Sequence, residues 1–147
     1  MRTIPTHSGN IAVFLMAGLI SLLILSCERA GPVQPAQGDL QPTLSSIQAN
    51  IFSQKCALSG CHLGSSAPLG LELSEGKSRG NLVNVPSQEV PKLLRVAPGN
   101  PDQSYMVRKI EGAAGIIGAR MPRGRDPLSQ EEINTIRQWI QDGAPDN

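Results

Sequence analysis

The apolar residues follow two different patterns along the chain. Residues 11–25 form an almost unbroken apolar run, whereas after position 43 the apolar residues recur at the spacing of one helix face. The first such face consists of Leu44, Ile47, Ile51 and Phe52. Polar residues, Gln48 among them, fall on the opposite side. This pattern predicts a helix that runs directly into Cys56.

A second helix is predicted near the end of the sequence. Ser129 and Glu132 have the spacing of a capping box, in which a hydroxyl and a carboxylate bind free amides at a helix start. The apolar stripe that follows consists of Ile133, Ile136 and Ile140, with Trp139 at its margin. Gly143 is placed to end this helix.

The residues between these two helices predict long loops. Residues 63–100 are rich in Gly, Pro and Ser, so we expect irregular structure with one short helix near 88–95. Residues 98–101 predict a turn, and Ser104 is placed to cap a helix over 105–111. No segment alternates as a strand would, and no repeat is present. The sequence therefore predicts an all-α domain.

The apolar run at 11–25 has the length of a signal sequence. A membrane-spanning helix needs about twenty residues, which is longer than this run. The run leads into Ile24-Leu25-Ser26-Cys27, which resembles the lipobox of bacterial lipoproteins. The resemblance implies a signal peptide over 1–26 and a diacylglycerol on the sulfur of Cys27. The alternative is an ordinary signal, or a short anchor helix, with an incidental cysteine.

The residues after Cys27 have the composition of a tether. Residues 28–43 carry three prolines, two glycines and scattered charges, so they cannot bury a core. We therefore divide the chain into the signal peptide, a lipidated tether over 27–43 and a folded domain over 44–147.

Charge and composition exclude some partners and suggest a bound group. The formal net charge is +1, so no basic surface for nucleic acid is expected. Beyond residue 27 the aromatic residues are Phe52, Tyr105 and Trp139. A domain with so few large side chains would have a thin core, which a non-protein group would complete.

The candidate chemistry lies in the segment Cys56-Ala-Leu-Ser-Gly-Cys61-His62. A Cys56–Cys61 disulfide is one interpretation, since exported proteins form disulfides. A zinc site is another, but it needs about four ligands, and after the leader the chain offers only these two free cysteines and one histidine. The third is covalent haem, in which two thiols hold the ring and the next histidine binds iron. His62 is the only histidine after the leader, and its place beside the second cysteine favours haem.

The region from about 43 to 145 resembles the mono-haem c-type cytochromes, in the variant group with a CxxxxCH motif. The resemblance rests on the helix before Cys56, on Arg120-Met121-Pro122, and on the last helix with Gln138-Trp139-Ile140. It implies a cytochrome c-like helical domain whose long loops wrap around one covalent haem. Cys56 and Cys61 would attach this haem, His62 would bind iron, and Met121 would be the second ligand. The first and last helices would cross and pack.

The available side chains allow two sulfur ligands. No second histidine follows the leader, so the candidates are Met106 and Met121. Met106 falls in a predicted helix beside Val107, where a core role is expected. Met121 follows a glycine-rich stretch and precedes Pro122, so its loop can cover the haem face opposite His62. We therefore assign Met121 as the distal ligand.

The resulting functional prediction is electron transfer rather than enzymatic catalysis. Two axial ligands would close the iron to substrates, and no acid, base or nucleophile clusters near the motif. The protein would exchange electrons with redox partners in or at a bacterial membrane, on its extracytoplasmic side, and no small-molecule substrate is expected. Three arginines, Arg120, Arg123 and Arg125, would pair with haem propionates or an acidic partner, or form a solvated loop face.

Two other functions remain open at this point. One is a haem-free lipoprotein interaction module with a Cys56–Cys61 disulfide. The other is a haem sensor or enzyme whose sixth iron position is open because Met121 does not bind.

Overall fold

The computed structural model describes residues 39–147. The predicted signal peptide, Cys27 and most of the tether lie outside the described residues. Within 39–147, no helix is long and apolar enough to cross a membrane.

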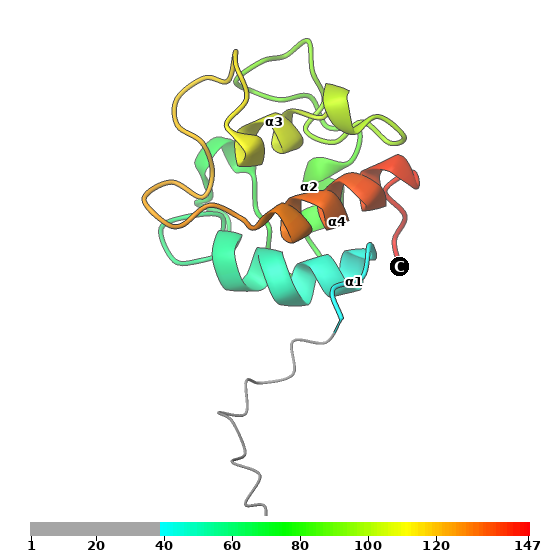
Figure 1. Cartoon of the computed structure of the whole chain (residues 1–147). Helices are drawn as coiled ribbons and strands as arrows, with labels where there is room; N and C mark the ends of the chain where they lie inside the picture. Colours follow the sequence, from blue (N-terminus) through cyan, green and yellow to red (C-terminus); the bar gives the residue numbers. More distant parts are fainter. Residues whose placement is uncertain (1–38) are drawn as a thin grey trace, which may run out of the picture. The chain divides into compact units, whose positions relative to one another are not determined.

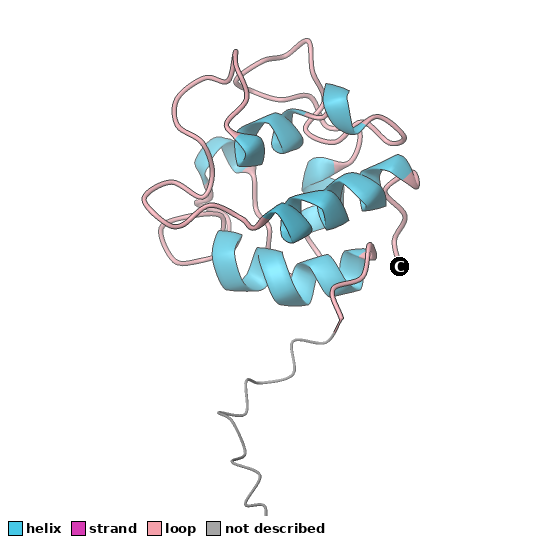
Figure 2. Ribbon diagram, viewed as in Figure 1, coloured by secondary structure: helices cyan, strands magenta, loops and turns pink. Residues whose placement is uncertain are grey.

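The described residues form short helices joined by long loops (Figures 1 and 2). In chain order, these are α1 (Leu44–Ile47), η1 (Gln48–Cys56), η2 (Pro68–Gly70), α2 (Ser78–Leu82), η3 (Pro101–Gln103), α3 (Tyr105–Glu111) and α4 (Gln130–Gln141). No strand forms between residues 39 and 147, where β-pairing is limited to isolated bridges. The all-α prediction is confirmed for this part of the chain.

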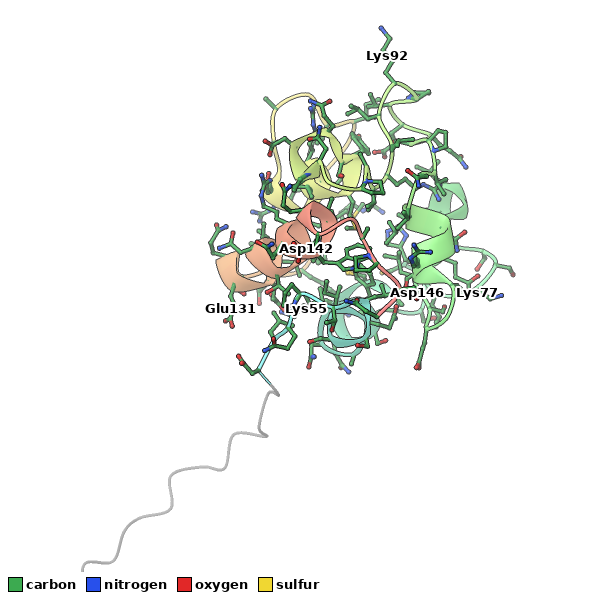
Figure 3. The ribbon with its side chains drawn as sticks, turned by 90° about the vertical axis from the view of Figure 1, so that its right-hand side faces the viewer. Lys55, Lys77, Lys92, Glu131, Asp142 and Asp146 are labelled. Atoms are coloured by element: carbon green, nitrogen blue, oxygen red, sulfur yellow. The ribbon has the colours of Figure 1, made fainter. Side chains whose placement is uncertain are left out.

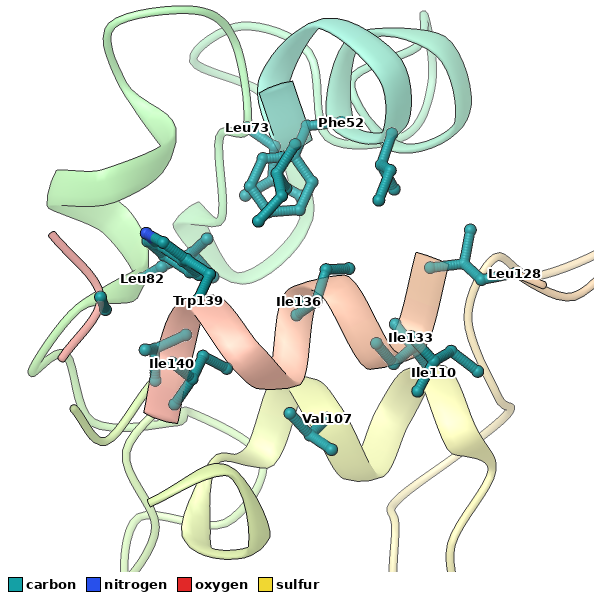
Figure 4. Close-up of a cluster of buried hydrophobic side chains, with 14 of the residues drawn as sticks. Phe52, Leu73, Leu82, Val107, Ile110, Leu128, Ile133, Ile136, Trp139 and Ile140 are labelled. Carbon is teal, nitrogen blue, oxygen red and sulfur yellow. The ribbon is translucent and has the colours of Figure 1, made fainter. Parts of the chain in front are cut away.

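Helix α4 lies at the centre of the core. In Figure 4, Phe52 and Leu73 lie on one side of α4, and Val107 and Ile110 of α3 lie on its other side. Helices α1 and α3 both contact α4. The first and last helices therefore pack together, as expected. Unlike these core residues, charged side chains such as Lys77 and Lys92 are exposed, and Lys92 points outward from the folded domain (Figure 3).

The start and end of α4 follow the sequence prediction. The Ser129 hydroxyl accepts a hydrogen bond from the Glu132 amide, and the Glu132 carboxylate accepts one from the Ser129 amide. Gly143 follows the helix with a φ of 95°, a conformation that suits glycine. The capping box is thus confirmed.

Trp139 was expected at the margin of the apolar stripe, but it is as fully buried as Ile136 and Ile140. Its indole N–H donates to the carbonyl of Pro145 at 3.0 Å. The chain after α4 folds back under the ring and supplies this acceptor. That return was not visible in the helical pattern.

The helix before Cys56 is confirmed, with one correction. It begins as α1 and continues as η1, a π-helix, up to Cys56. Gln48 was expected on the polar face, but it is buried. Its amide donates to Leu73 O at 3.0 Å and accepts from the Ser78 hydroxyl at 2.6 Å. Burial is tolerated because the side chain finds these partners.

The helix expected near 88–95 is absent. This segment doubles back instead, with Ser87 N bonded to Leu93 O and Arg95 N bonded to Val85 O. Pro91 lies within it and cannot donate a helical hydrogen bond. The sequence interpretation missed the short helix α2, which lies earlier in the same stretch.

Helix α3 has the predicted bounds, but Ser104 does not cap it with its side chain. The Ser104 hydroxyl donates to Asn100 O and accepts from Ala97 N, both at 2.9 Å. These bonds hold the turn before α3 rather than the helix amides.

A candidate haem-binding cavity

A cavity of about 370 Å³ opens between η1, α3 and the loops around them. Cys56, Cys61 and His62 line it together with Met106 and Met121. The fold therefore brings to one cavity the two cysteines expected to attach a haem and the three side chains considered as iron ligands. Its remaining wall includes apolar side chains from several elements, namely Phe52, Leu71, Leu73, Leu82, Ile110, Leu128 and Ile136.

The ring of His62 is oriented by a backbone acceptor. Nδ1 lies 2.9 Å from the carbonyl oxygen of Leu71. A carbonyl accepts only, so Nδ1 carries the proton and Nε2 keeps a free lone pair. The backbone carbonyl of His62 also accepts from Leu73 N at 2.8 Å, which ties the motif to the chain beyond it.

The surroundings keep this imidazole neutral. Burial lowers the pKa of His62, and the hydrogen bond to Leu71 partly offsets that effect. The positive charges of Arg95 and Lys109 then lower the pKa further. A neutral imidazole with one fixed N–H is the form that binds a metal.

Cys56 and Cys61 are both free, half-buried thiols. The loop between them is closed by bonds from Cys61 N to Leu58 O and from His62 N to Cys56 O. Gly60 has a φ of 77°, which lets the loop turn sharply. Burial, with a smaller contribution from Glu132, raises the pKa of Cys56 to about 12. Its thiol therefore stays protonated at neutral pH.

Met106 and Met121 are more alike in burial and in position at the cavity than the sequence suggested. Both are half-buried and both line the cavity. Met106 packs against the hydrophobic core cluster, and its backbone follows the regular path of α3. Met121 lies in a loop, and its amide donates to the carbonyl of Lys109 at 2.9 Å. The structure thus places both sulfur candidates at the cavity.

Arg95 is a buried cation that the sequence interpretation missed. Its exposed fraction is 7%, and its guanidinium donates to Leu69 O at 2.6 Å and to Asn81 O at 2.8 Å. Burial lowers its pKa. No salt bridge joins it to a carboxylate within residues 39–147. A buried cation facing a cavity without a counter-ion favours an anionic ligand.

The other cations at the cavity divide into paired and unpaired groups. Lys109 forms a salt bridge with Glu89 at 3.0 Å, and Lys55 forms one with Glu132. Arg123 and Arg125 line the cavity, are exposed, and form no salt bridge in the described part of the chain.

Arg120 does not line the cavity. Its side chain covers Gly112, where a Cβ atom added to the glycine would lie 2.8 Å from Arg120 Cδ. The predicted arginine cluster is therefore split, and two of its three members face the cavity.

Two further observations concern the alternatives raised by the motif. Among residues 39–147, no group of three or more His, Cys, Asp or Glu side chains is placed to hold a metal ion. Cys56 and Cys61 are not joined by a disulfide in this structure.

Comparison with known proteins adds no relative. No family model matches the chain, no curated protein matches it, and no solved structure matches its fold.

Proposed function

We propose that this domain has a cytochrome c-like fold, holds one covalent haem, and transfers single electrons. The observation that carries the proposal is the orientation of His62. Its Nδ1 is bound to Leu71 O, which leaves Nε2 as the nitrogen that could bind a metal, and His62 lines a cavity that two thiols and two thioethers also line. A haem iron with imidazole and thioether ligands supplies a one-electron ferric–ferrous couple of raised potential.

The side chains of the cavity fit the chemistry of haem. The apolar wall suits a porphyrin ring, and burying apolar surface is the main source of such affinity. The ring also carries carboxylates, for which Arg95 offers a buried guanidinium that has no carboxylate partner within 39–147. Arginine binds carboxylates through parallel N–H groups. Arg123 and Arg125 place two more cations along the wall.

The motif residues then have separate roles. Cys56 and Cys61 would form thioether bonds to the ring, and His62 would bind the iron from one face. Leu71 O fixes the imidazole tautomer and raises its basicity as a ligand. Met121 would be the second iron ligand, with Met106 as the alternative. With two protein ligands on the iron, the domain would carry electrons rather than act on a substrate.

The location proposed for the protein follows from the leader. Cys27 would carry lipid, and the tether over 27–43 would hold the domain at the extracytoplasmic side of a bacterial membrane. Multiple acyl chains give stable anchoring where one does not. The partners would be redox proteins in or at that membrane.

Haem staining after a denaturing gel tests the cofactor directly. The full chain is exported in a bacterial host that attaches haem to thiols, beside a Cys56→Ser/Cys61→Ser variant. We expect the wild type to stain and the double variant not to stain. Cys27→Ala is the matched control, because it removes the remaining cysteine of the three and leaves the cavity unchanged.

Each outcome of this experiment decides between the functions. An unstained, colourless wild type would overturn the proposal in favour of a haem-free module. A stained wild type with a high-spin spectrum would favour a sensor or enzyme with an open iron position. Sharp low-spin absorption bands in the reduced state are the expected result.

The anchor is tested by labelled fatty acid. We expect the wild type to incorporate label and to sediment with membranes, and Cys27→Ala to incorporate none. Equal labelling of the two chains would contradict the lipoprotein assignment while leaving the haem proposal intact.

A further inference from the structure

Tyr105 begins α3 and joins two segments that are distant in the sequence. Its side chain is buried, with an exposed fraction of 5%. Its hydroxyl donates to Glu89 Oε2 at 2.7 Å and accepts from the amide of Ile117 at 3.0 Å. One hydroxyl thus connects the 87–95 turn, α3 and the loop that follows α3.

Lys109 completes the same junction one helical turn later. Its ammonium lies 3.0 Å from Glu89 Oε2 and donates to the carbonyl of Ile117 at 2.8 Å. It also lies 5.9 Å from the centre of the Tyr105 ring, within the range of a cation–π contact. Both backbone polar groups of Ile117 are therefore bound by side chains of α3.

The loop after α3 is attached by hydrogen bonds rather than by apolar packing. No residue from 113 to 120 is buried, and the side chain of Ile117 is 53% exposed. Apart from the two bonds at Ile117, the loop is attached where Ala113 N donates to Arg108 O and where Met121 N donates to Lys109 O. The junction therefore holds the middle of a segment whose far end is Met121.

We infer that Tyr105 is a positioning residue, which acts with Glu89 and Lys109 to hold the Met121 segment against the cavity. The inference rests on the proposed function, because Met121 matters as a ligand of the haem iron. Met121 follows Ile117 closely in the chain, and both are bound to α3. The segment is thereby ordered before the thioether binds, which lowers the entropy cost of ligation.

The junction is sensitive to the loss of one oxygen atom. Tyr105→Phe keeps the ring but leaves the Ile117 amide without its acceptor and Glu89 without one donor. The segment therefore loses the free energy of this hydrogen bond. The segment is then held near its middle by Lys109 alone.

Two measurements on the full-length haem protein test the inference. The first is hydrogen exchange of the Ile117 amide, which we expect to be about tenfold faster in Tyr105→Phe. The second is the weak red charge-transfer band of ferric haem bound to sulfur. We expect this band to weaken in Tyr105→Phe and in Lys109→Met, and the haem to stay attached in both.

Two further variants separate positioning from general stability. Glu89→Gln keeps an amide oxygen as acceptor for the Tyr105 hydroxyl, so it should retain most of the band. Arg137→Gln is the matched control, because it breaks the ion pairs with Asp102 and Glu111, which do not involve Tyr105, Glu89 or Ile117. It should leave both the band and the Ile117 amide unchanged.

The results distinguish this inference from the proposed function. A wild type with haem and the band, together with unchanged band and Ile117 exchange in Tyr105→Phe, would overturn the positioning role alone. A wild type without haem overturns the proposed function and, with it, the purpose assigned to the junction. If Tyr105→Phe does not fold, Lys109→Met decides the question by the same two measurements.

Discussion

The core around α4 and the wall of the cavity are built differently. In the core, Val107, Trp139 and Ile140 have exposed fractions of 0%, and the buried indole N–H of Trp139 has its acceptor. The cavity wall comes largely from loops. It carries half-buried thiols and thioethers, a buried arginine and a hydrogen-bonded imidazole.

The two regions differ in how their polar groups are bound. Apolar burial and internal hydrogen bonds satisfy the groups of the core. In the cavity, Arg95 has no carboxylate partner among residues 39–147, and His62 Nε2 is left with a free lone pair. A ligand that binds the folded state stabilises it by mass action. With the proposed haem bound, we therefore expect substitutions in the core to change stability and those in the cavity to change the haem spectrum.

The largest expected effect on stability is in the core. Trp139→Ala removes a fully buried indole and should lower the free energy of unfolding by about 3–5 kcal/mol. Urea denaturation followed by circular dichroism measures this. Gln138→Ala, at the exposed neighbouring position, should change it by less than about 0.5 kcal/mol. Equal effects of the two changes would contradict the central role of Trp139.

The two methionines give the sharpest test of the comparison. With the proposed haem bound, Met121→Ala should abolish the sulfur-to-iron charge-transfer band of the ferric protein and lower the potential, with the haem still attached. Met106→Ala should keep the band and cost about 1–2 kcal/mol, less than a fully buried methionine, because Met106 is only half-buried.

Each other outcome of the methionine experiment has a definite meaning. Loss of the band in Met106→Ala alone would reverse the assignment of the ligand. Retention of the band in both variants would show that neither methionine binds iron in this domain.

A smaller effect is expected at the start of α4. Ser129→Ala removes the hydroxyl of the capping box and should lower the free energy of unfolding by about 1 kcal/mol. Ser129→Asp, which keeps an acceptor at this position, should restore most of the loss. Ser129 itself does not line the cavity, so the absorption spectrum should stay the same. A changed spectrum would mean that Glu132, which pairs with the cavity residue Lys55, couples the cap to the cavity.

The smallest effect is a pH dependence at Glu89. Burial alone would raise its pKa, but hydrogen bonds from Tyr105 and Lys109 and the ammonium charge bring it below the ordinary value. The ionised carboxylate therefore stabilises the fold above the unfolded pKa of about 4.3, and this contribution is lost as the pH falls through the lower folded value. The stability difference between wild type and Glu89→Gln should be constant near neutral pH and shrink below about pH 4. A difference that does not vary with pH would rule out this account.

The spacing of nearby residues was sufficient to predict the position of the helices that bury an apolar stripe. The capping box predicted the start of α4, and Gly143 marked its end, because both depend on residues within one or two turns. The same holds for the helix leading to Cys56 and for the bounds of α3. The motif also predicted that Cys56, Cys61 and His62 would lie together, since they are neighbours in the chain.

Only the tertiary structure showed the contacts between residues that are distant in the sequence. The buried Gln48 side chain forms hydrogen bonds with Leu73 O and the Ser78 hydroxyl. The buried Arg95 guanidinium donates hydrogen bonds to the carbonyls of Leu69 and Asn81. The junction of Tyr105 with Glu89 and Ile117 likewise spans separate loops. A polar side chain is stable inside a protein only where its partners converge, and the sequence does not state which loops converge. The periodicity of apolar residues determines which face of a helix is buried. The path of the loops determines which residues pack against that face.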